Sequence, residues 1–501
     1  MRAKRHNSGL TFFFMKRRQF LTLSGIAAAS LALSACAPAR EIVKRTRGGN
    51  EFVVTPRASA ENWRVLERLT FAPRAQEVLR VNEIGRDAWL EEQLAPETLD
   101  DWECDSRTRG MDTLWMDADL ALNVRTEGIK PELQGARVLR AVYSKRQLYE
   151  NVVEFWSDHF SISIDKFDCL WLKGVDDREV IRKHAFGNFA DLLWASMHSP
   201  AMLHYLDNQD NFAHAPNENY ARELLELHSL GVDAGYTQRD VRETARALTG
   251  WTVNQGWRRG RFEFNAAQHD AGAKTILGAA LAAGGGERDG EQVFHAILAH
   301  PALPRFIARK LTRRFVADAP PPALVERVAQ TFTQTRGDIK AVLRAMFDAD
   351  EFRNAPPKYK RPLDFVAGAL RQLDAETNAG APIQDALTRM GQPLFQWTTP
   401  DGFPDTTNAW KNNLLPRWQF ALALATNELQ GTRVAWENLA HVANDASFVG
   451  ALQGFSTRLL GFELPKDVAD ELQAQWRNLD TDLILPSALA LVLASPQYQW
   501  K

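Results

Sequence analysis

Between Trp63 and Leu493, apolar residues recur three or four positions apart and almost never alternate with polar ones. This spacing is the period of amphipathic helices, whereas sustained alternation would have indicated strands. The run from Val138 to Phe160 shows the period most clearly. Further helices are predicted at 178–196, 217–230, 238–249, 291–299, 303–315, 321–334, 338–347, 362–373, 416–427 and 481–494. We therefore expect an all-α fold.

One region departs from the helical pattern. Residues 253–290 are rich in glycine, and two short segments within them, 261–264 and 274–277, have the composition of strands. The 501-residue chain contains 15 Trp and 27 Phe, which are enough large side chains to fill an extensive core. We predict a large single multi-helix domain over residues 61–501, with a loop-rich insertion that carries at most short strands.

The N-terminus has the features of a secretory signal. Arg17 and Arg18 stand directly before an apolar stretch, as they do in twin-arginine export signals. That stretch, 21–33, is too short to cross a bilayer as a stable helix. We predict that residues 1–35 are a twin-arginine signal peptide and that the protein is exported.

The signal is followed by a lipoprotein motif. Leu33-Ser-Ala-Cys36 resembles the box after which a cysteine is acylated, and residues 36–60 lack any apolar period, as expected of a tether. We therefore predict that Cys36 carries lipid and holds the protein on the periplasmic or cell-surface face of a membrane. The alternative is a plain signal peptide with an incidental cysteine.

Charge and cysteine content restrict the function classes. Residues 1–35 contain six basic side chains and no acidic one, so the remaining 466 residues hold 54 basic and 62 acidic side chains, a net charge of −8. This balance gives no indication of nucleic-acid binding. Cys104 and Cys169 are the only cysteines after Cys36, and they could pair in an oxidising compartment. They form no CxxC motif, which argues against a cysteine-based zinc site.

The segment Glu154–Phe160 is the first that could carry chemistry. On a helix, Glu154 and Asp158 are one turn apart, so their carboxylates share a face. Another face carries Trp156, His159 and Phe160, and a histidine in an apolar pocket can act as a ligand or a base. The alternative is a core histidine that donates a hydrogen bond to a carbonyl.

The second such segment is Pro216–Gly231, where Pro216 is expected to open a helix and Gly231 to close it. Its buried face is predicted to include His228 and these apolar residues: Tyr220, Ala221, Leu224, Leu225 and Leu227. A row of Glu218, Arg222 and Glu226 on the opposite face is predicted to be a structural ion-pair ladder. At about 100° per residue, Glu223 and His228 lie about 140° apart, so this helix alone cannot clamp an ion.

The third segment is His269-Asp270 in the loop-rich insertion, where functional groups are often placed. If His159, His228, His269 and Asp270 converge near Glu223 or Glu218, they would bind a divalent metal such as Zn, Fe or Mn. The alternative is three unrelated histidines, each bonded to a local carbonyl. No GxSxG, HExxH, P-loop, Rossmann or CxxCH motif occurs in the chain.

These segments also carry a family resemblance, which extends over about residues 62–500. The chain resembles the bacterial domain of unknown function 1800 family in the following blocks: Arg68–Arg74, Phe155–Phe160, His184–Phe189, Ser199–Leu203, Pro216–Gly231, Tyr236–Gln238, Arg246–Trp251, His269–Asp270 and His300–Pro301. The resemblance implies a secreted, mainly helical protein whose activity is unknown. It also implies a partner, because such genes often neighbour those of the phosphatase- or sulfatase-like domain of unknown function 1501 family. Asp158 departs from the family pattern, in which asparagine is expected.

Two functions are compatible with these features. The first is a non-catalytic lipoprotein that assists the phosphatase- or sulfatase-like partner or binds polysaccharide through its tryptophans. The second is an extracytoplasmic metal-dependent enzyme, a hydrolase or an oxidoreductase, built on the His/Asp/Glu residues. Because no complete catalytic set can be read from the sequence, the binding or assembly function is favoured.

Overall fold

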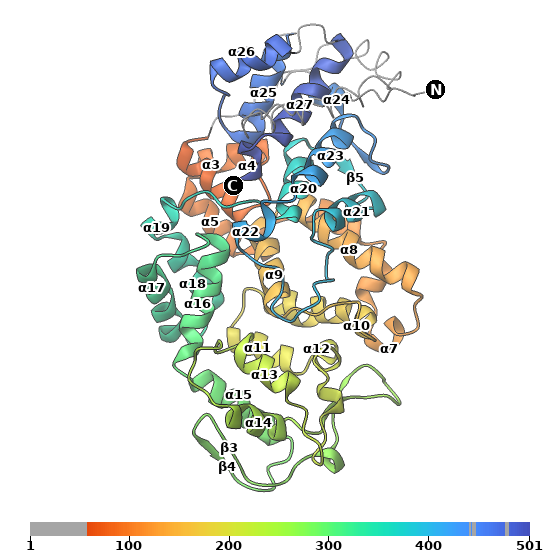
Figure 1. The fold of residues 1–501 in the computed structure, drawn as a ribbon, viewed down its shortest axis with the longest axis vertical. Helices are drawn as coiled ribbons and strands as arrows, with labels where there is room; N and C mark the ends of the chain where they lie inside the picture. Colours follow the sequence, from red (N-terminus) through yellow and green to blue (C-terminus); the bar gives the residue numbers. More distant parts are fainter. Residues whose placement is uncertain (1–57, 440–441, 443–446, 476–479) are drawn as a thin grey trace, which may run out of the picture.

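The computed structural model describes residues 58–439, 442, 447–475 and 480–501, and most of these are helical (Figure 1). The predicted signal peptide, Cys36 and nearly all of the predicted tether lie outside the described residues. Among the described residues, strands occur only as three short antiparallel pairs. The prediction of an all-α fold is confirmed. No described helix is both long and apolar enough to cross a membrane.

The insertion at 253–290 divides the helices into two groups along the chain. Before the insertion they are α3 (Ala60–Leu69), α4 (Ala75–Ile84), α5 (Arg86–Leu94), α6 (Trp102–Thr108), α7 (Ala118–Ala121), α8 (Thr126–Tyr143), α9 (Gln147–His159), α10 (Cys169–Asp176), α11 (Phe189–Met197), α12 (Pro200–Tyr205), α13 (Glu218–Glu226) and α14 (Gln238–Ala247). After it they are α15 (Arg288–Ala299), α16 (Ala302–Phe315), α17 (Pro322–Gln334), α18 (Ile339–Phe347), α19 (Asp350–Arg353), α20 (Pro362–Gln372), α21 (Ala381–Arg389), α22 (Thr407–Trp410), α23 (Leu414–Ala425), α24 (Trp436–Leu439), α25 (Phe448–Leu460), α26 (Lys466–Gln475) and α27 (Ile484–Ala494).

The insertion forms two small hairpins. Strand β1 (Trp251–Val253) pairs with β2 (Phe262–Phe264), and β3 (Lys274–Ile276) pairs with β4 (Ala279–Leu281). Strands β2 and β3 confirm the two predicted strand segments. A third pair, β5 (Glu376–Thr377) with β6 (Thr432–Arg433), lies outside the insertion.

Several helices begin at a residue whose side chain caps the first turn. The hydroxyl of Ser199 accepts a hydrogen bond from the Met202 amide, with Pro200 in the first helical position of α12. Thr237 caps α14 together with Asp240, and Asp338 caps α18. Each cap satisfies amide groups that the first helical turn leaves without a partner, so the boundary is fixed locally.

Three predicted helical spans differ from the observed ones. The Val138–Phe160 run divides into α8 and α9, because Asp101 accepts hydrogen bonds from the Ser144 hydroxyl and the Lys145 amide and holds the break between them. The 178–196 span begins with a π-helix at Asp177–Arg182, and α11 starts only at Phe189. The 217–230 helix ends at Glu226.

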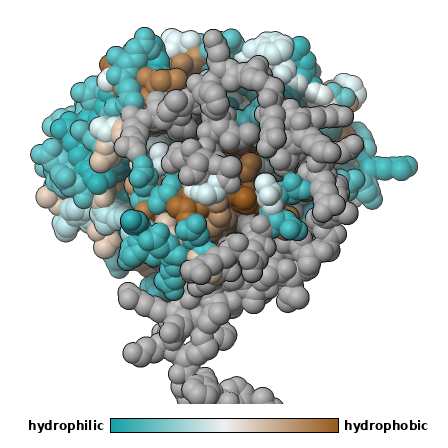
Figure 2. Space-filling view, turned by 90° about the horizontal axis from the view of Figure 1, so that it is seen from above, coloured by the Kyte–Doolittle hydropathy of each residue, from teal (hydrophilic) through white to brown (hydrophobic). Residues whose placement is uncertain are grey.

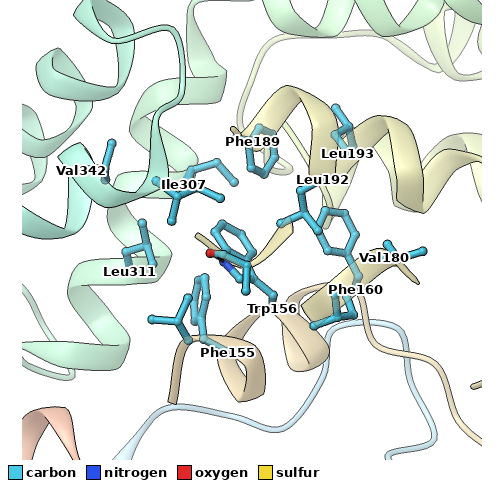
Figure 3. Close-up of a cluster of buried hydrophobic side chains, with 14 of the residues drawn as sticks. Phe155, Trp156, Phe160, Val180, Phe189, Leu192, Leu193, Ile307, Leu311 and Val342 are labelled. Carbon is cyan, nitrogen blue, oxygen red and sulfur yellow. Dashed lines mark hydrogen bonds between the residues drawn. The ribbon is translucent and has the colours of Figure 1, made fainter. Parts of the chain in front are cut away.

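The buried hydrophobic residues form two large clusters. The first is built from α3 to α5 and α9 to α19, and the second mainly from α8, α20, α21, α23, α25 and α27. Figure 3 shows the first cluster around α9, where Trp156 lies among side chains of α11 and α16, such as Phe189 and Ile307. Cys104 belongs to the second cluster and Cys169 to the first; both are buried free thiols, so they do not pair.

Candidate functional site

His159 and His228 are the only two of the predicted metal ligands that the structure brings together. Their ring centroids are 6.2 Å apart, and both side chains are buried. His159 lies at the end of α9 and donates from Nε2 to the His228 carbonyl oxygen at 3.0 Å. The rings of Trp156, Phe160 and Phe189 surround it. This is the core-histidine arrangement that the sequence left open as an alternative.

Burial keeps both imidazoles neutral. It lowers the pKa of His159 well below its usual value and that of His228 to about 3, and the nearby ammonium of Lys310 lowers both further. Within the described residues, His159 Nδ1 and His228 Nε2 have no hydrogen-bond partner. Two free ring nitrogens are too few for the closed, four-coordinate shell of a structural zinc site.

The other predicted ligands have different partners. His269 donates from Nδ1 to the Thr249 carbonyl oxygen at 2.8 Å, and its Nε2 lies 3.2 Å from the Asp289 carboxylate. Asp270 forms a two-point ion pair with Arg246, at 2.7 and 3.1 Å. These contacts lock the insertion onto α14 and α15.

Glu223 is half-buried on α13, and burial raises the pKa of its carboxyl. Nowhere in the described part of the chain do three or more His, Cys, Asp or Glu side chains group as a metal site requires. The predicted set of His159, Glu223, His228, His269 and Asp270 is therefore not assembled into one metal centre.

The predicted ladder on α13 forms in part. Arg222 pairs with Glu218 at 3.0 Å and also donates to Gln238, and these side chains are partly exposed. The helix ends at Glu226 because the His228 amide bonds to the Glu223 carbonyl, five residues back, in a wider turn. That turn, rather than a continued helix, sets the direction of the His228 ring.

Glu154 and Asp158 do share a face of α9, as predicted, and they enter a buried ion network that the sequence did not indicate. Arg314 pairs with Glu154 at 2.7 Å and with Asp405 at 3.0 Å. Arg361 pairs with Asp158 at 2.6 Å and with Asp405 at 3.4 Å. Burial, together with the neighbouring Glu154 carboxylate and against the pull of Arg361, raises the pKa of Asp158 to about 6.

The cavities of the described structure differ in size, and the one beside this ion network is too small to be a ligand site. The cavity beside Glu154 and Asp158 has a volume of about 30 Å³, which is too small for a substrate. A second pocket of about 240 Å³ lies between the π-helix and α11, where the Asp176 carboxylate is already engaged by Lys173 and Ser199. A third has about 720 Å³, within the usual range for ligand pockets.

We call this cavity, the largest of these three, the α3–α25 pocket. It lies between α3, the C-terminal end of α25 and the last residues of the chain, and Figure 1 shows the C-terminus beside α3. Its apolar lining includes the aromatic side chains of Trp63, Phe462 and Trp500. Figure 2 views the end of the molecule formed by α25, α26 and α27, where apolar residues appear at the surface among hydrophilic ones.

Charged side chains line the same pocket. Arg64, Glu67 and Arg68 come from α3, and Lys501 comes from the C-terminal segment, where its ammonium pairs with Asp364 at 2.7 Å. Burial raises the pKa of the Glu67 carboxyl, and the positive charges of Lys360 and Arg68 oppose that rise. A carboxyl with a perturbed pKa in an aromatic pocket is a typical feature of a binding or active site.

Lys360 is a buried cation next to this pocket. Its ammonium lies 3.7 Å from the centroid of the Tyr498 ring and has no hydrogen-bond partner among the described residues. Burial lowers the pKa of Lys360 to about 8, and the charge of Glu67 opposes the shift. Glu67 and Lys360 thus influence each other's charge without forming a direct ion pair within 4.0 Å in the described structure.

Comparison with known proteins assigns the family. The sequence model of the family described as "Protein of unknown function (DUF1800)" matches residues 64–500. The chain belongs to this family. The predicted resemblance is confirmed, and it covers nearly all of the described residues. Neither a curated protein nor a solved structure matches the chain.

In this DUF1800 chain, the pocket residues were missed by sequence reasoning. Glu67 and Trp63 carried one usable signal, since they stand one and five residues before the family block that begins at Arg68. Lys360 and Trp500 carried none, because they lie about 300 and 430 residues away from α3 and only the fold brings them to it.

Proposed function

We propose that this DUF1800 protein is an exported, lipid-anchored binding protein that holds a ligand in the α3–α25 pocket. The observation that carries the proposal is the pocket itself. Its volume of about 720 Å³, its aromatic lining and its convergent charged groups match the general properties of ligand sites. The predicted histidines, in contrast, are used in contacts that stabilise the fold.

The exported and anchored part of the proposal rests on the N-terminal sequence, with the Arg17-Arg18 pair and Cys36. It is tested by cell fractionation. We expect that Cys36→Ser moves the protein from the membrane fraction to the soluble fraction and that replacing both arginines with lysine blocks export. Membrane recovery of Cys36→Ser equal to that of the wild type would contradict the anchor.

The binding part of the proposal is tested by analysing what the purified protein retains. The full-length wild type is purified from its native membrane and extracted with organic solvent, and mass spectrometry identifies small molecules in stoichiometric amount. We expect Trp500→Ala and Phe462→Ala to lose the retained molecule. Trp257→Ala is the matched control, since Trp257 is 87% exposed and lies outside the pocket. Equal retention by all three variants would contradict the pocket as the binding site.

The phosphatase- or sulfatase-like partner belongs to the same proposal. A binding protein anchored on the membrane surface where such an enzyme acts would hold a ligand for it. The test is co-purification of a protein of the domain of unknown function 1501 family with the wild type. Loss of that partner from the Trp500→Ala preparation would link the two roles, whereas absence of the partner from every preparation would remove it from the proposal.

A further inference from the structure

The wall of the α3–α25 pocket is a fixed aromatic surface. Gly461 ends α25 with φ +79°, and a Cβ atom at this position would lie 2.6 Å from the indole ring of Trp63. The ring therefore rests against the main chain of Gly461 and cannot move toward it. Two other aromatic side chains of the lining remain accessible, since Phe462 is 49% exposed and Trp500 is 37% exposed. Covering such apolar surface is favourable by about 25 cal/mol per Å².

The charged side of the pocket has an excess of cations. Arg68 is almost fully buried and donates to the main-chain oxygens of Val316, at 3.3 Å, and Pro356. Arg64 donates to the main-chain oxygen of Arg353. Neither arginine has a carboxylate within 4.0 Å among the described residues, although a buried cation such as Arg68 is normally paired with one.

The count of charges at this end of the pocket is clear. Arg64, Arg68, Lys360 and Lys501 supply four cations, and two carboxyls, Glu67 and Asp364, face them. Because Asp364 is already bound to Lys501, at least two positive charges stay without a counter-charge from the part of the chain that the structure describes. A bound anion would supply one, in an environment of low dielectric where the attraction is strong.

We infer that the α3–α25 pocket binds a single-chain anionic amphiphile, with its acyl chain against Trp63, Phe462 and Trp500 and its carboxylate or phosphate head at Arg64 and Arg68. This inference rests on the proposed binding function and names the class of ligand. An uncharged sugar would use the aromatic wall and leave the excess of positive charge without a partner. A free inorganic anion would use the charges and leave the aromatic surface uncovered.

The position of the pocket agrees with a ligand that comes from a membrane. Ala58 lies on the pocket rim and follows the predicted anchor, Cys36, by 22 residues. A chain of 22 residues spans at most about 80 Å, even when fully extended. A lipid-anchored protein would therefore keep the pocket within that distance of the bilayer surface, where single-chain amphiphiles are found.

The experiment uses the full-length protein and a dibrominated stearate, because bromine on the acyl chain quenches tryptophan fluorescence at short range. Titration of the wild type with the acid and with its neutral methyl ester gives two dissociation constants. We expect the acid to bind at least about tenfold more tightly, because only its charged head can accept charge-assisted hydrogen bonds from the two arginines. Competition with hexadecyl phosphate shows whether a phosphate head is accepted in place of the carboxylate.

Two pairs of variants locate the ligand. Arg64→Gln should raise the dissociation constant of the acid about tenfold and leave that of the ester unchanged, whereas Arg222→Gln, a distant surface control, should change neither. Trp500→Phe should remove part of the quenching amplitude, and Trp257→Phe should not.

The outcomes separate the ligand class from the binding function. Equal affinity of the wild type for the acid and the ester, or an unchanged preference in Arg64→Gln, would overturn the anionic amphiphile. If a neutral molecule is then found in the extract of the native protein, the proposed binding function still stands and only the anionic class of the ligand is wrong. If no probe binds and no molecule is retained, both the inference and the proposed function fail.

Discussion

The buried carboxyl of Asp158 gives the sharpest prediction about this protein's stability. In the unfolded chain the pKa of this group is 3.8, and in the folded protein burial and the nearby Glu154 raise it to about 6. Between these values the folded state binds the proton more strongly than the unfolded state does. The free energy of unfolding therefore falls as the pH rises through this window.

The magnitude follows from the size of the shift. A difference of about two pKa units corresponds to roughly 3 kcal/mol at pH 7, at 1.36 kcal/mol per unit. The side chain is 18% exposed and contacts Arg361 at 2.6 Å, so solvent and the ion pair reduce the effect. We expect Asp158→Asn, which stays neutral at every pH, to be more stable than the wild type by about 1–2 kcal/mol at pH 7 and equally stable near pH 4.

Glu154→Gln is the matched control, because Glu154 lies one turn earlier on the same face of α9. Its carboxylate pairs with Arg314 at 2.7 Å and accepts from Gln392 at 3.3 Å. Removing it leaves buried Arg314 with one carboxylate fewer and should destabilise the fold by about 3 kcal/mol. Urea unfolding followed by circular dichroism at pH 4 and pH 7 measures both variants. Destabilisation of Asp158→Asn at pH 7, or a difference independent of pH, would refute the reasoning.

Three further predictions concern two glycine turns, a partly exposed ion pair and two buried thiols. Gly402→Ala should lower the free energy of unfolding by about 3 kcal/mol, because its φ is +75° and the new Cβ would lie 2.1 Å from a main-chain oxygen of α9. Gly391→Ala is the control, because its φ is +93° but the nearest atom to its new Cβ would be 3.9 Å away, and it should cost only about 1 kcal/mol. Equal decreases in melting temperature for the two variants would contradict the proposed clash at Gly402. Arg222→Ala should change stability in urea by no more than about 0.5 kcal/mol, since its ion pair is partly exposed, and a loss above about 3 kcal/mol would indicate a buried network. Burial raises the pKa of the Cys104 thiol, and it raises the pKa of the Cys169 thiol to about 12. Because the thiolate is the reactive form, iodoacetamide at pH 8 should label both cysteines only after unfolding. Rapid labelling of the native protein, measured by mass spectrometry, would contradict this prediction.

The sequence by itself determined features that depend on residues within a few turns of one another. The period of apolar residues predicted the helical fold. The caps at Ser199, Thr237 and Asp338 are equally local, because each acts on amides two or three positions away. The i, i+4 spacing also placed Glu154 and Asp158 on one face of α9.

The tertiary structure alone decided the partners of these groups. Arg314 and Arg361 reach Glu154 and Asp158 from more than 150 residues away, and no local pattern encodes that approach. The same holds for the histidines. His269 could be placed in a loop from sequence, but its bond to Asp289 depends on how the insertion folds onto α15.

The α3–α25 pocket shows this limit most fully. Trp63, Phe462 and Trp500 come from three distant parts of the chain, and each reads in sequence as an ordinary aromatic residue. Their exposure, and the perturbed pKa of Glu67 beside them, arise only when the end of the chain packs against α3. Burial and electrostatic fields depend on every element that surrounds a site, so a chain read one segment at a time cannot specify them.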